Sequence, residues 1–553
     1  MVAIPDPLGR VLGVKDLFRF PNPVNEVSAR LVAGGVVLLT LLIALLGAAP
    51  AAADEALIDE GRKLYRDGLR ADGTPLEGRR HAGPPLRGRD IACVQCHRPS
   101  GLGTVEGVAV APAITGRHLF SPGQPRAGRR PRQAPGMTLH DHGFRTRPAY
   151  DLPALARAMA DGIGPGGQAL DPLMPRYALT TREVEALAAY LGSLGATPPP
   201  GITDEAIHLA TVVAPDASPR RRQAVLDVLQ HCVAEHGPRP GSERRPWRLH
   251  TWTLHGPPPG WPAQLARHLR EQPVFALLSG IGREWAPVHA FCEAEGLPCL
   301  FPNTDAPGPA PRSSIYLSPG VAVEGRVMAR YLEDRPRPPR RLVQVFAADD
   351  IGRHGAAALA AELPTAAQLD LRPGTPLPPL AEGDALALWL PPDALREALA
   401  TLPPLPAEVL VLVSATLGEL ERRDETGLGA TTLRQLRVVH PFDAPGRRLE
   451  RMVFNLGGWM SGRGLKLARD TERLQGDTWS ACAVTARALY TLDATPSREG
   501  LLERVEDAYA GATTTAYPRF TLGPGQRYGS KGAYVMRISA DDRLEVEGEW
   551  VVP

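Results

Sequence analysis

Apolar side chains recur at helical spacing in three segments of the first 195 residues. The first predicted helix covers 57–65, the second covers 151–162, and the third covers 180–194 and begins with a capping-box pattern. Gly61 on the first helix would let the backbones of the first and third helices approach closely. The pattern predicts a short first domain over 54–195 that contains these three helices.

The pattern changes after a proline-rich linker, 196–202, which reads Ala-Thr-Pro-Pro-Pro-Gly-Ile. From residue 203 to residue 553, short apolar strands alternate with helical patterns. Such alternation predicts parallel sheets with helices on their faces, and about 350 residues are enough for two α/β lobes. The predicted strands cover 207–213, 249–254, 274–278, 342–346, 385–390 and 409–413.

Residues 1–53 have the features of an export segment. The stretch 31–46 is nearly all apolar, Arg30 flanks it with a positive charge, and 51–53 is an Ala-Ala-Ala run typical of a signal-cleavage site. The apolar run 31–53 is also long enough to cross a bilayer, at ~1.5 Å per residue over a ~30 Å core. The segment is therefore either a cleaved signal or a retained membrane anchor. In both cases we expect the rest of the chain to be periplasmic, soluble or tethered to the inner membrane.

Composition narrows the range of partners. The formal net charge is +2, so charge gives no indication of a nucleic-acid partner. Hydrophobic residues make up 43% of the chain, which is enough for folded domains. In an oxidising compartment, the six cysteines are candidates for disulfides or for a cofactor site.

Two of those cysteines belong to the motif Cys93-Val94-Gln95-Cys96-His97. Thiols three residues apart on a helical turn can each bond one vinyl group of a haem, and the adjacent histidine can then ligate the iron. A thioredoxin-like redox site would lack a role for the histidine, and a zinc site would need a second pair of ligands that the sequence does not offer. The motif predicts one covalent haem c, attached at Cys93 and Cys96, with His97 as an iron ligand.

The sixth iron ligand is predicted to be Met174. It stands in the loop Asp171-Pro172-Leu173-Met174-Pro175, which has no hydrophobic period that would explain a methionine as core. Thioether ligation raises the reduction potential relative to a second histidine. The other candidates are Met159 on an apolar helix face, Met137, and the histidines His118, His140 and His142.

The arrangement of residues 54–195 resembles a class I monohaem cytochrome c. The residues that carry the resemblance are Gly61 and Tyr65, the motif from Cys93 to His97, the Met174 loop, and Tyr190-Leu191 on the last helix. The resemblance implies an all-α fold around the haem and a role in one-electron transfer. The stretch 117–142 is longer than a minimal cytochrome needs.

Residues 203–553 resemble the type I periplasmic binding proteins, in particular the branched-chain amino-acid and receptor-ligand-binding group. The resemblance rests on the stretches 207–214, 275–280, 297–302, 517–519, 523–528 and 530–534. It implies two α/β lobes that close on a small-molecule ligand. Ser279 and Gly280 follow a strand, where exposed backbone amides could hold a carboxylate, although an ordinary tight turn explains them as well.

The remaining cysteines leave their pairing open. Cys292 and Cys299 are seven residues apart and could close a short loop, or could be buried thiols. Cys232 and Cys482 would need a long-range pairing that the sequence does not reveal.

The sequence predicts a periplasmic electron-transfer protein rather than an enzyme. Its partner would be a periplasmic dehydrogenase, for which the resemblance implies a quinoprotein, or an oxidase. The second domain would dock that partner or sense a solute. The alternative is a solute-binding or sensor protein in which the haem detects redox state or a gas. A haem peroxidase is a third hypothesis, which a single haem with a closed coordination shell disfavours.

Overall fold

The computed structural model describes residues 54–80, 83–106, 109–123, 147–237, 244–309, 311–347, 350–420, 434–492, 496–507 and 515–553. The candidate export segment 1–53 lies outside these residues, as do Met137, His140 and His142. Within the described ranges, no helix is both long enough and apolar enough to cross a membrane. The chain divides into two compact units, a smaller one (Met1–Gln95, Leu119–Arg129 and Phe144–Ser193) and a larger one (Cys96–His118, Arg130–Gly143 and Leu194–Pro553).

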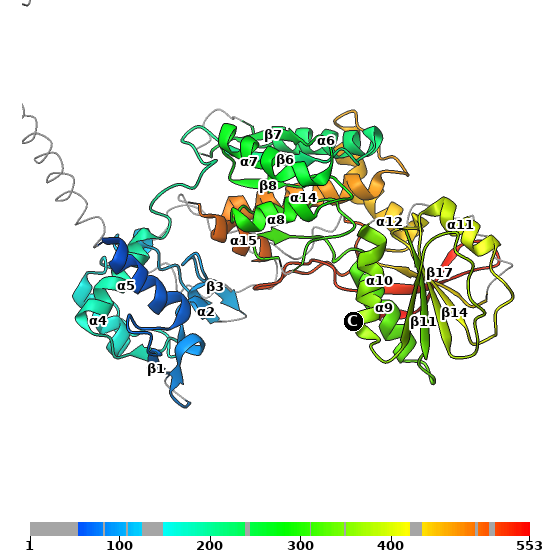
Figure 1. Cartoon of the computed structure of the whole chain (residues 1–553). Helices are drawn as coiled ribbons and strands as arrows, with labels where there is room; N and C mark the ends of the chain where they lie inside the picture. The colour runs from blue at the N-terminus through cyan, green and yellow to red at the C-terminus, as the bar shows by residue number, and fades with distance from the viewer. Residues whose placement is uncertain are drawn as a thin grey trace, which may run out of the picture. The chain divides into compact units, whose positions relative to one another are not determined.

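The smaller unit contains the three helices that the sequence predicted, and Figure 1 labels the last two of them. Asp151 caps the second helix by accepting a hydrogen bond from the backbone of Ala154, and Gly162 ends it in the left-handed conformation. The capping box at the third helix also forms, because the Thr180 backbone N–H donates to the Glu183 carboxylate. These helices are 54–67, α4 (Leu152–Asp161) and α5 (Thr181–Ser193).

Gly61 is required where helix 54–67 crosses α5. A Cβ atom at this position would lie 2.0 Å from the Ala186 carbonyl oxygen and 2.8 Å from the Tyr190 Cβ. The ring of Tyr65 packs against that of Tyr190, with 5.2 Å between their centroids. The close approach predicted for Gly61 is confirmed.

The smaller unit is not purely helical, so the expectation of an all-α domain needs correction. Strand β1 (Glu77–Arg79) pairs antiparallel with β2 (Leu86–Arg87) on one side and with β5 (Arg176–Tyr177) on the other. Each strand has only two or three residues, which is too short for an alternating pattern to be visible in sequence. A 3-10 turn, η1 (Gly88–Ile91), follows β2, and the Tyr177 hydroxyl donates to the Ile91 carbonyl over 2.7 Å.

The larger unit begins within the haem motif. The short helix α2 (Val94–His97) leads into a hairpin of β3 (Thr104–Glu106) and β4 (Ala109–Ala111), which is followed by α3 (Gly116–Leu119). The larger unit then continues from Leu194 into two α/β lobes.

The first lobe is built on a fully parallel five-stranded sheet of order β10-β9-β8-β6-β7. Side chains of α6, α14 and α15 form the core on one face, and those of α7 and α8 form it on the other. The strands are β6 (Ile207–Val213), β7 (Trp247–Thr253), β8 (Ala276–Leu278), β9 (Cys299–Leu300) and β10 (Ser314–Ile315). The helices are α6 (Pro219–Ala234), η2 (Pro258–Gly260), α7 (Trp261–Glu271), α8 (Ala286–Ala294), α14 (Glu472–Thr491) and α15 (Arg498–Asp507).

The second lobe has a seven-stranded sheet of order β12-β11-β13-β14-β15-β16-β17. Strand β16 runs antiparallel to both of its neighbours, β15 and β17. Helices α9 and α10 cover one face of this sheet (Figure 1). The strands are β11 (Arg341–Phe346), β12 (Ala367–Leu371), β13 (Asp384–Trp389), β14 (Leu410–Ser414), β15 (Leu436–His440), β16 (Ala533–Ile538) and β17 (Leu544–Val551). The helices are α9 (Val321–Glu333), α10 (Asp350–Glu362) and α11 (Pro392–Ala400). The helical turns α12 (Pro445–Met452), η4 (Val453–Gly457) and α13 (Gly458–Ser461) precede α14.

The chain crosses between the lobes three times, after β10, after β15 and before β16. The first and third crossings lie side by side. The Tyr316 backbone N–H donates to the Arg527 carbonyl over 2.8 Å, and the Ser530 N–H donates to the Leu317 carbonyl over 2.8 Å. At the second crossing, the Asp443 N–H donates to the Ala516 carbonyl over 2.9 Å. The three segments therefore form one hydrogen-bonded hinge.

Four of the six cysteines are joined in disulfides inside the first lobe. Cys232 on α6 is bonded to Cys482 on α14, across a sequence separation of 250 residues. Cys292 on α8 is bonded to Cys299 on β9, across seven residues. The long bridge ties α14 to the part of the lobe that precedes it in sequence.

Candidate functional site

Cys93 and Cys96 are the two cysteines that remain outside the disulfides. Cys93 stands directly before α2 and Cys96 is the third residue of this helix; the Gln95 backbone N–H donates to the Ala92 carbonyl over 3.1 Å. His97 ends α2, and its side chain is only 8% exposed. Residues Val94–His97 thus form one short helical turn that ends on a buried imidazole.

The His97 ring is oriented by one hydrogen bond to the backbone. Its Nδ1 lies 2.8 Å from the Pro112 carbonyl oxygen, and because a carbonyl only accepts, Nδ1 carries the proton. Burial lowers the pKa of His97, although the bond to Pro112 opposes that shift. A neutral imidazole with a protonated Nδ1 offers Nε2 as its metal-binding nitrogen.

The turn behind His97 is tight. Gly103 has a φ of 69°, and a Cβ there would meet the Ala111 carbonyl oxygen at 2.0 Å. The Gly103 N–H donates to the His97 carbonyl over 3.0 Å, which closes the loop between α2 and the β3–β4 hairpin. The hairpin therefore holds Pro112 where it can orient His97.

This donor set fits a haem c: two thiols three residues apart, and a buried neutral imidazole with Nδ1 fixed by a carbonyl. It fits a metal bound by side chains alone less well. Within the described ranges, no group of three or more His, Cys, Asp or Glu side chains is placed to hold a metal ion. The haem itself stays a prediction.

The candidates for the sixth iron ligand differ in their burial and in their contacts. Met174 is half-buried in a turn in which its N–H donates to the Asp171 carbonyl over 3.0 Å. Met159 is 8% exposed and packs in the core face of α4, as its position on an apolar stripe suggested. The His118 Nδ1 lies 2.8 Å from the Thr115 hydroxyl. Met174 as an iron ligand stays a prediction.

A second candidate site lies in the first lobe, at the carboxyl ends of its strands and beside the hinge. It is a narrow crevice whose side chains leave no space for a water molecule. The residues that line it come from four segments: Pro302, Asn303 and Thr304 after β9, Tyr316, Leu317 and Ser318 after β10, Arg473 and Asp477 on α14, and Tyr517.

Asn303 is the most constrained side chain of this crevice. Its Nδ2 donates to the Ser279 hydroxyl over 3.0 Å, to the Gly280 carbonyl over 3.1 Å and to the Thr478 hydroxyl over 3.2 Å. Its Oδ1 is buried and has no hydrogen-bond partner among the described residues. A buried amide oxygen without a partner is costly, so this atom is a candidate acceptor for a bound donor group.

Ser279 and Gly280, the predicted ligand-binding pair, do not line the crevice. They stand behind Asn303 and position its amide. Ser279 has a φ of 55°, in the left-handed region that a non-glycine residue rarely adopts, so the turn after β8 is strained. A Cβ on Gly280 would lie 2.9 Å from the Trp285 ring and from the Val212 carbonyl.

The charged groups of the crevice are already engaged with the protein. Arg473 lies 3.4 Å from the Asp305 carboxylate and stacks 5.0 Å from the centroid of the Phe442 ring. Asp477 accepts the Ala516 backbone N–H over 2.8 Å. Burial raises the pKa of the Tyr517 hydroxyl despite the nearby Arg473, so this hydroxyl is neutral.

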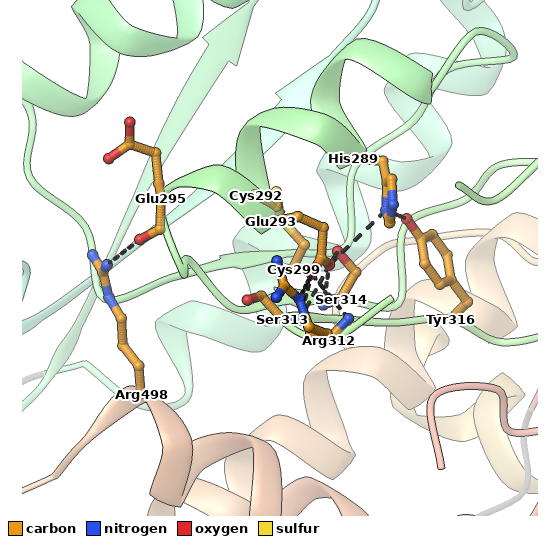
Figure 2. The surroundings of a disulfide bond; sticks show 10 residues. All are labelled: His289, Cys292, Glu293, Glu295, Cys299, Arg312, Ser313, Ser314, Tyr316 and Arg498. Atoms are coloured by element: carbon orange, nitrogen blue, oxygen red, sulfur yellow. Dashed lines mark hydrogen bonds and ion pairs between the residues drawn. A yellow bond between two sulfur atoms is a disulfide. The ribbon is translucent and has the colours of Figure 1, made fainter. Parts of the chain in front are cut away.

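Residues close to the Cys292–Cys299 disulfide hold Tyr316 in place. Figure 2 shows that His289 points toward the Tyr316 ring; its Nδ1 lies 2.8 Å from the Tyr316 hydroxyl. Beside Cys292, the Glu293 carboxylate accepts backbone N–H groups from Arg312 and Ser314 at 2.9 and 3.0 Å. Burial opposes the ionisation of Glu293, but the backbone N–H groups of Ser313 and Arg312 and the Ser314 hydroxyl outweigh it and lower its pKa. The disulfide, Glu293 and His289 together fix the strand that carries Tyr316 to the hinge.

No family model and no curated protein matches the chain. Several solved structures are similar to part of the chain. They include a substrate-binding protein of an ABC transporter from Aeropyrum pernix, at 9% identity over 63% of this chain and 97% of that one, with a TM-score of 0.45. A leucine-binding protein from Thermotoga maritima has 12% identity over 63% and 99%, with a TM-score of 0.44. A branched-chain amino-acid transporter protein from Thermus thermophilus with bound valine has 10% identity over 63% and 97%, with a TM-score of 0.44.

The two-lobed α/β fold expected for residues 203–553 is confirmed by the parallel sheet of the first lobe, the mixed sheet of the second and the three hinge crossings. The crevice residues were not predicted. Asn303, Arg473 and Tyr517 are distant in sequence, and only the return of α14 to the first lobe brings them together. Two stretches near them, 297–302 and 517–519, carried part of the resemblance.

Proposed function

We propose that the protein is a periplasmic c-type cytochrome that transfers single electrons, fused to a two-lobed binding-protein-like domain. The observation that carries this proposal is the His97 imidazole held by Pro112 at the end of a turn flanked by two thiols outside the disulfides. Cys93 and Cys96 would hold one haem c covalently, and His97 and Met174 would ligate its iron. The haem supplies a one-electron couple at a potential that the protein sets.

The residues around the motif have their own tasks in this function. Pro112 keeps Nδ1 protonated and thereby leaves Nε2 for the iron. The buried position of His97 excludes water from this ligand. The electron donor or acceptor would be a periplasmic quinoprotein dehydrogenase or an oxidase, and the two-lobed domain would dock it.

The test is a visible spectrum of the purified full chain in the oxidised and reduced states, together with a haem stain of a denaturing gel. We expect one covalent haem per chain. Cys93→Ala with Cys96→Ala should abolish the stain, whereas Cys292→Ala with Cys299→Ala, a matched pair of cysteines elsewhere, should leave it. A stain that persists without Cys93 and Cys96 would refute the assignment.

The axial ligand has a separate test. Met174→Ala should remove the near-infrared methionine-to-iron band of the oxidised protein, because the band requires a thioether on the iron. Met159→Ala is the matched control and should leave the band in place, because this side chain packs in the core of α4. If the band survives Met174→Ala, another ligand holds the sixth position, with His140 and His142 next in line.

A second candidate function is solute binding, with the haem as a sensor of redox state or of a gas. It is favoured by the buried, unsatisfied Oδ1 of Asn303 in the crevice of the first lobe. Such an acceptor suits a hydroxyl or ammonium donor. It does not suit a carboxylate, and Arg473 is already paired with Asp305. The crevice is closed in this structure, so a solute would enter only if its lining residues moved apart, and we expect no binding of leucine or valine because Arg473 is not available to hold their carboxylate.

The solute hypothesis is tested by thermal unfolding of the full chain with amino acids, short alcohols, aldehydes and carboxylates. A ligand at 100 times its dissociation constant should add ~2.7 kcal/mol of stability. A clear shift with leucine or valine would overturn the expectation that neither binds. No shift with any of the compounds, alongside rapid electron exchange with a dehydrogenase, would support the docking role.

A further inference from the structure

The residue after the predicted iron ligand is a buried arginine. Arg98 is 7% exposed and has a φ of 64°, a backbone conformation that non-glycine residues seldom adopt. Its Nη2 pairs with the carboxylate of Glu506, which stands near the end of α15 and is 2% exposed. The pairing spans 408 residues of sequence. A buried arginine is costly unless its charge is paired, and Glu506 supplies that partner.

Glu506 is the centre of a small charge cluster. One of its oxygens also accepts the Gly525 backbone N–H over 3.1 Å, and the other pairs with the Arg527 guanidinium. Two guanidinium groups, from Arg98 and Arg527, thus converge on one carboxylate. Removal of the Glu506 charge would leave both arginines with less compensation.

The same face of α15 holds the next residues of the segment. The Ser100 N–H donates to the Glu503 carboxylate over 2.8 Å, and the Ser100 hydroxyl donates to its other oxygen. Arg504 donates to the Leu102 carbonyl over 3.1 Å. Glu503 and Glu506 are three residues apart, so they share one side of the helix. Residues 98–102 are therefore clamped along α15 by at least three polar contacts.

Charge close to a haem sets its potential. A positive charge beside the iron favours the ferrous state, which carries one positive charge less than the ferric state. Arg98 is covalently next to His97, and the low exposure of the pair leaves little water to screen it. The reduction potential of the haem should therefore depend on how far Glu506 neutralises the charge of Arg98.

We propose that Glu506 of α15 is a positioning residue of the electron-transfer site, which sets the haem reduction potential by holding and neutralising Arg98 beside His97. This inference rests on the proposed haem function. It gives α15, an element of the two-lobed domain, a direct role in the cytochrome chemistry.

The experiment is a potentiometric titration of the full chain, followed through the haem absorption bands. Glu506→Gln should shift the potential upward, because Arg98 loses its counter-charge. Arg98→Gln should shift it downward, because a positive charge is lost. Glu499→Gln, an exposed carboxylate on the same helix, is the matched control and should leave the potential where it is. Glu506→Asp keeps the charge and should return the potential close to that of the parent protein.

Opposite signs for the two substitutions distinguish electrostatic tuning from loosening of the structure. Loosening would expose the haem and shift both variants in the same direction. Equal potentials for Glu506→Gln and Glu499→Gln, in chains that carry haem, would overturn the inference and leave the haem function standing. A parent chain without haem would refute the proposed function itself.

Discussion

The haem segment and the crevice of the first lobe are assembled in different ways. The two thiols and the imidazole lie within five consecutive residues, and the carbonyl that orients His97 is 15 residues further on. The crevice draws on segments after β9 and β10, on α14 and on Tyr517, and its bond from Asn303 to Thr478 spans 175 residues. Local sequence therefore encodes the chemistry of the first site, whereas the second exists only when the chain returns to its first lobe.

The largest expected effect concerns the Cys232–Cys482 disulfide, which joins α14 to α6 of the first lobe. Cys232→Ala with Cys482→Ala should destabilise the lobe by about 5 kcal/mol, because the disulfide closes a loop of 250 residues. The matched pair Cys292→Ala with Cys299→Ala removes equally buried sulfurs but a loop of seven residues. Its cost should be about 2.5 kcal/mol.

Denaturant unfolding of the oxidised proteins, followed by circular dichroism, measures both disulfide pairs. The haem content should be the same in the two double variants, because the motif at Cys93 is local. Equal destabilisation by the two pairs would show that the return of α14 does not depend on its disulfide. Loss of haem in the Cys232 and Cys482 variant would show that the haem site also depends on the distant segments of the first lobe.

The second prediction concerns the smaller unit, which is held together by a local close contact. Gly61→Ala places a methyl group 2.0 Å from the Ala186 carbonyl oxygen, so helix 54–67 must shift away from α5. We expect a loss of about 3–4 kcal/mol, at the upper end of the cost of overpacking. Gly192→Ala on α5 is the control, since its Cβ would make an ordinary 3.7 Å contact with Phe120. Equal melting temperatures for the two variants would contradict the close contact between helix 54–67 and α5 at Gly61.

The sequence allowed prediction of the elements that are defined by their own residues. The strand 207–213 matches β6 to the residue, and the caps at Asp151 and Thr180 form as expected, because each joins groups only three residues apart. The two-lobed fold followed from a repeated local alternation of strands and helices. In each case, the information lies within one segment.

The remainder depended on contacts between distant segments. The three-stranded sheet of the smaller unit has strands of two or three residues, which carry no period. Ser279 could be placed after a strand from sequence, but its role behind Asn303 depends on how β8 and β9 are paired. The partner of Arg98 could not be predicted, because a glutamate 408 residues away is one of many.

The smallest expected effect is a change with pH in the free energy of unfolding, which tests the contact between residues 98–102 and α15. Burial raises the pKa of Glu503 to about 7 from an ordinary value of 4.5, although the bonds from Ser100 and the charges of Arg98 and Arg504 oppose that shift. The folded state therefore binds a proton more tightly than the unfolded state. The stabilising contribution is complete below pH 4.5 and is lost as the pH rises through about 7.

Between pH 4.5 and pH 8, the parent protein should lose about 2–3 kcal/mol relative to Glu503→Gln, which cannot ionise. Chemical denaturation of both proteins across this range measures the difference, and the pH dependence common to the other groups cancels. Glu499→Gln, exposed on the same helix, should follow the parent protein at every pH. Parallel curves for Glu503→Gln and the parent would mean that Glu503 is ionised throughout, with the donors of Ser100 outweighing its burial. Glu503 would then hold Ser100 as a charged acceptor, and it would join Glu506 as a negative charge beside the predicted haem segment.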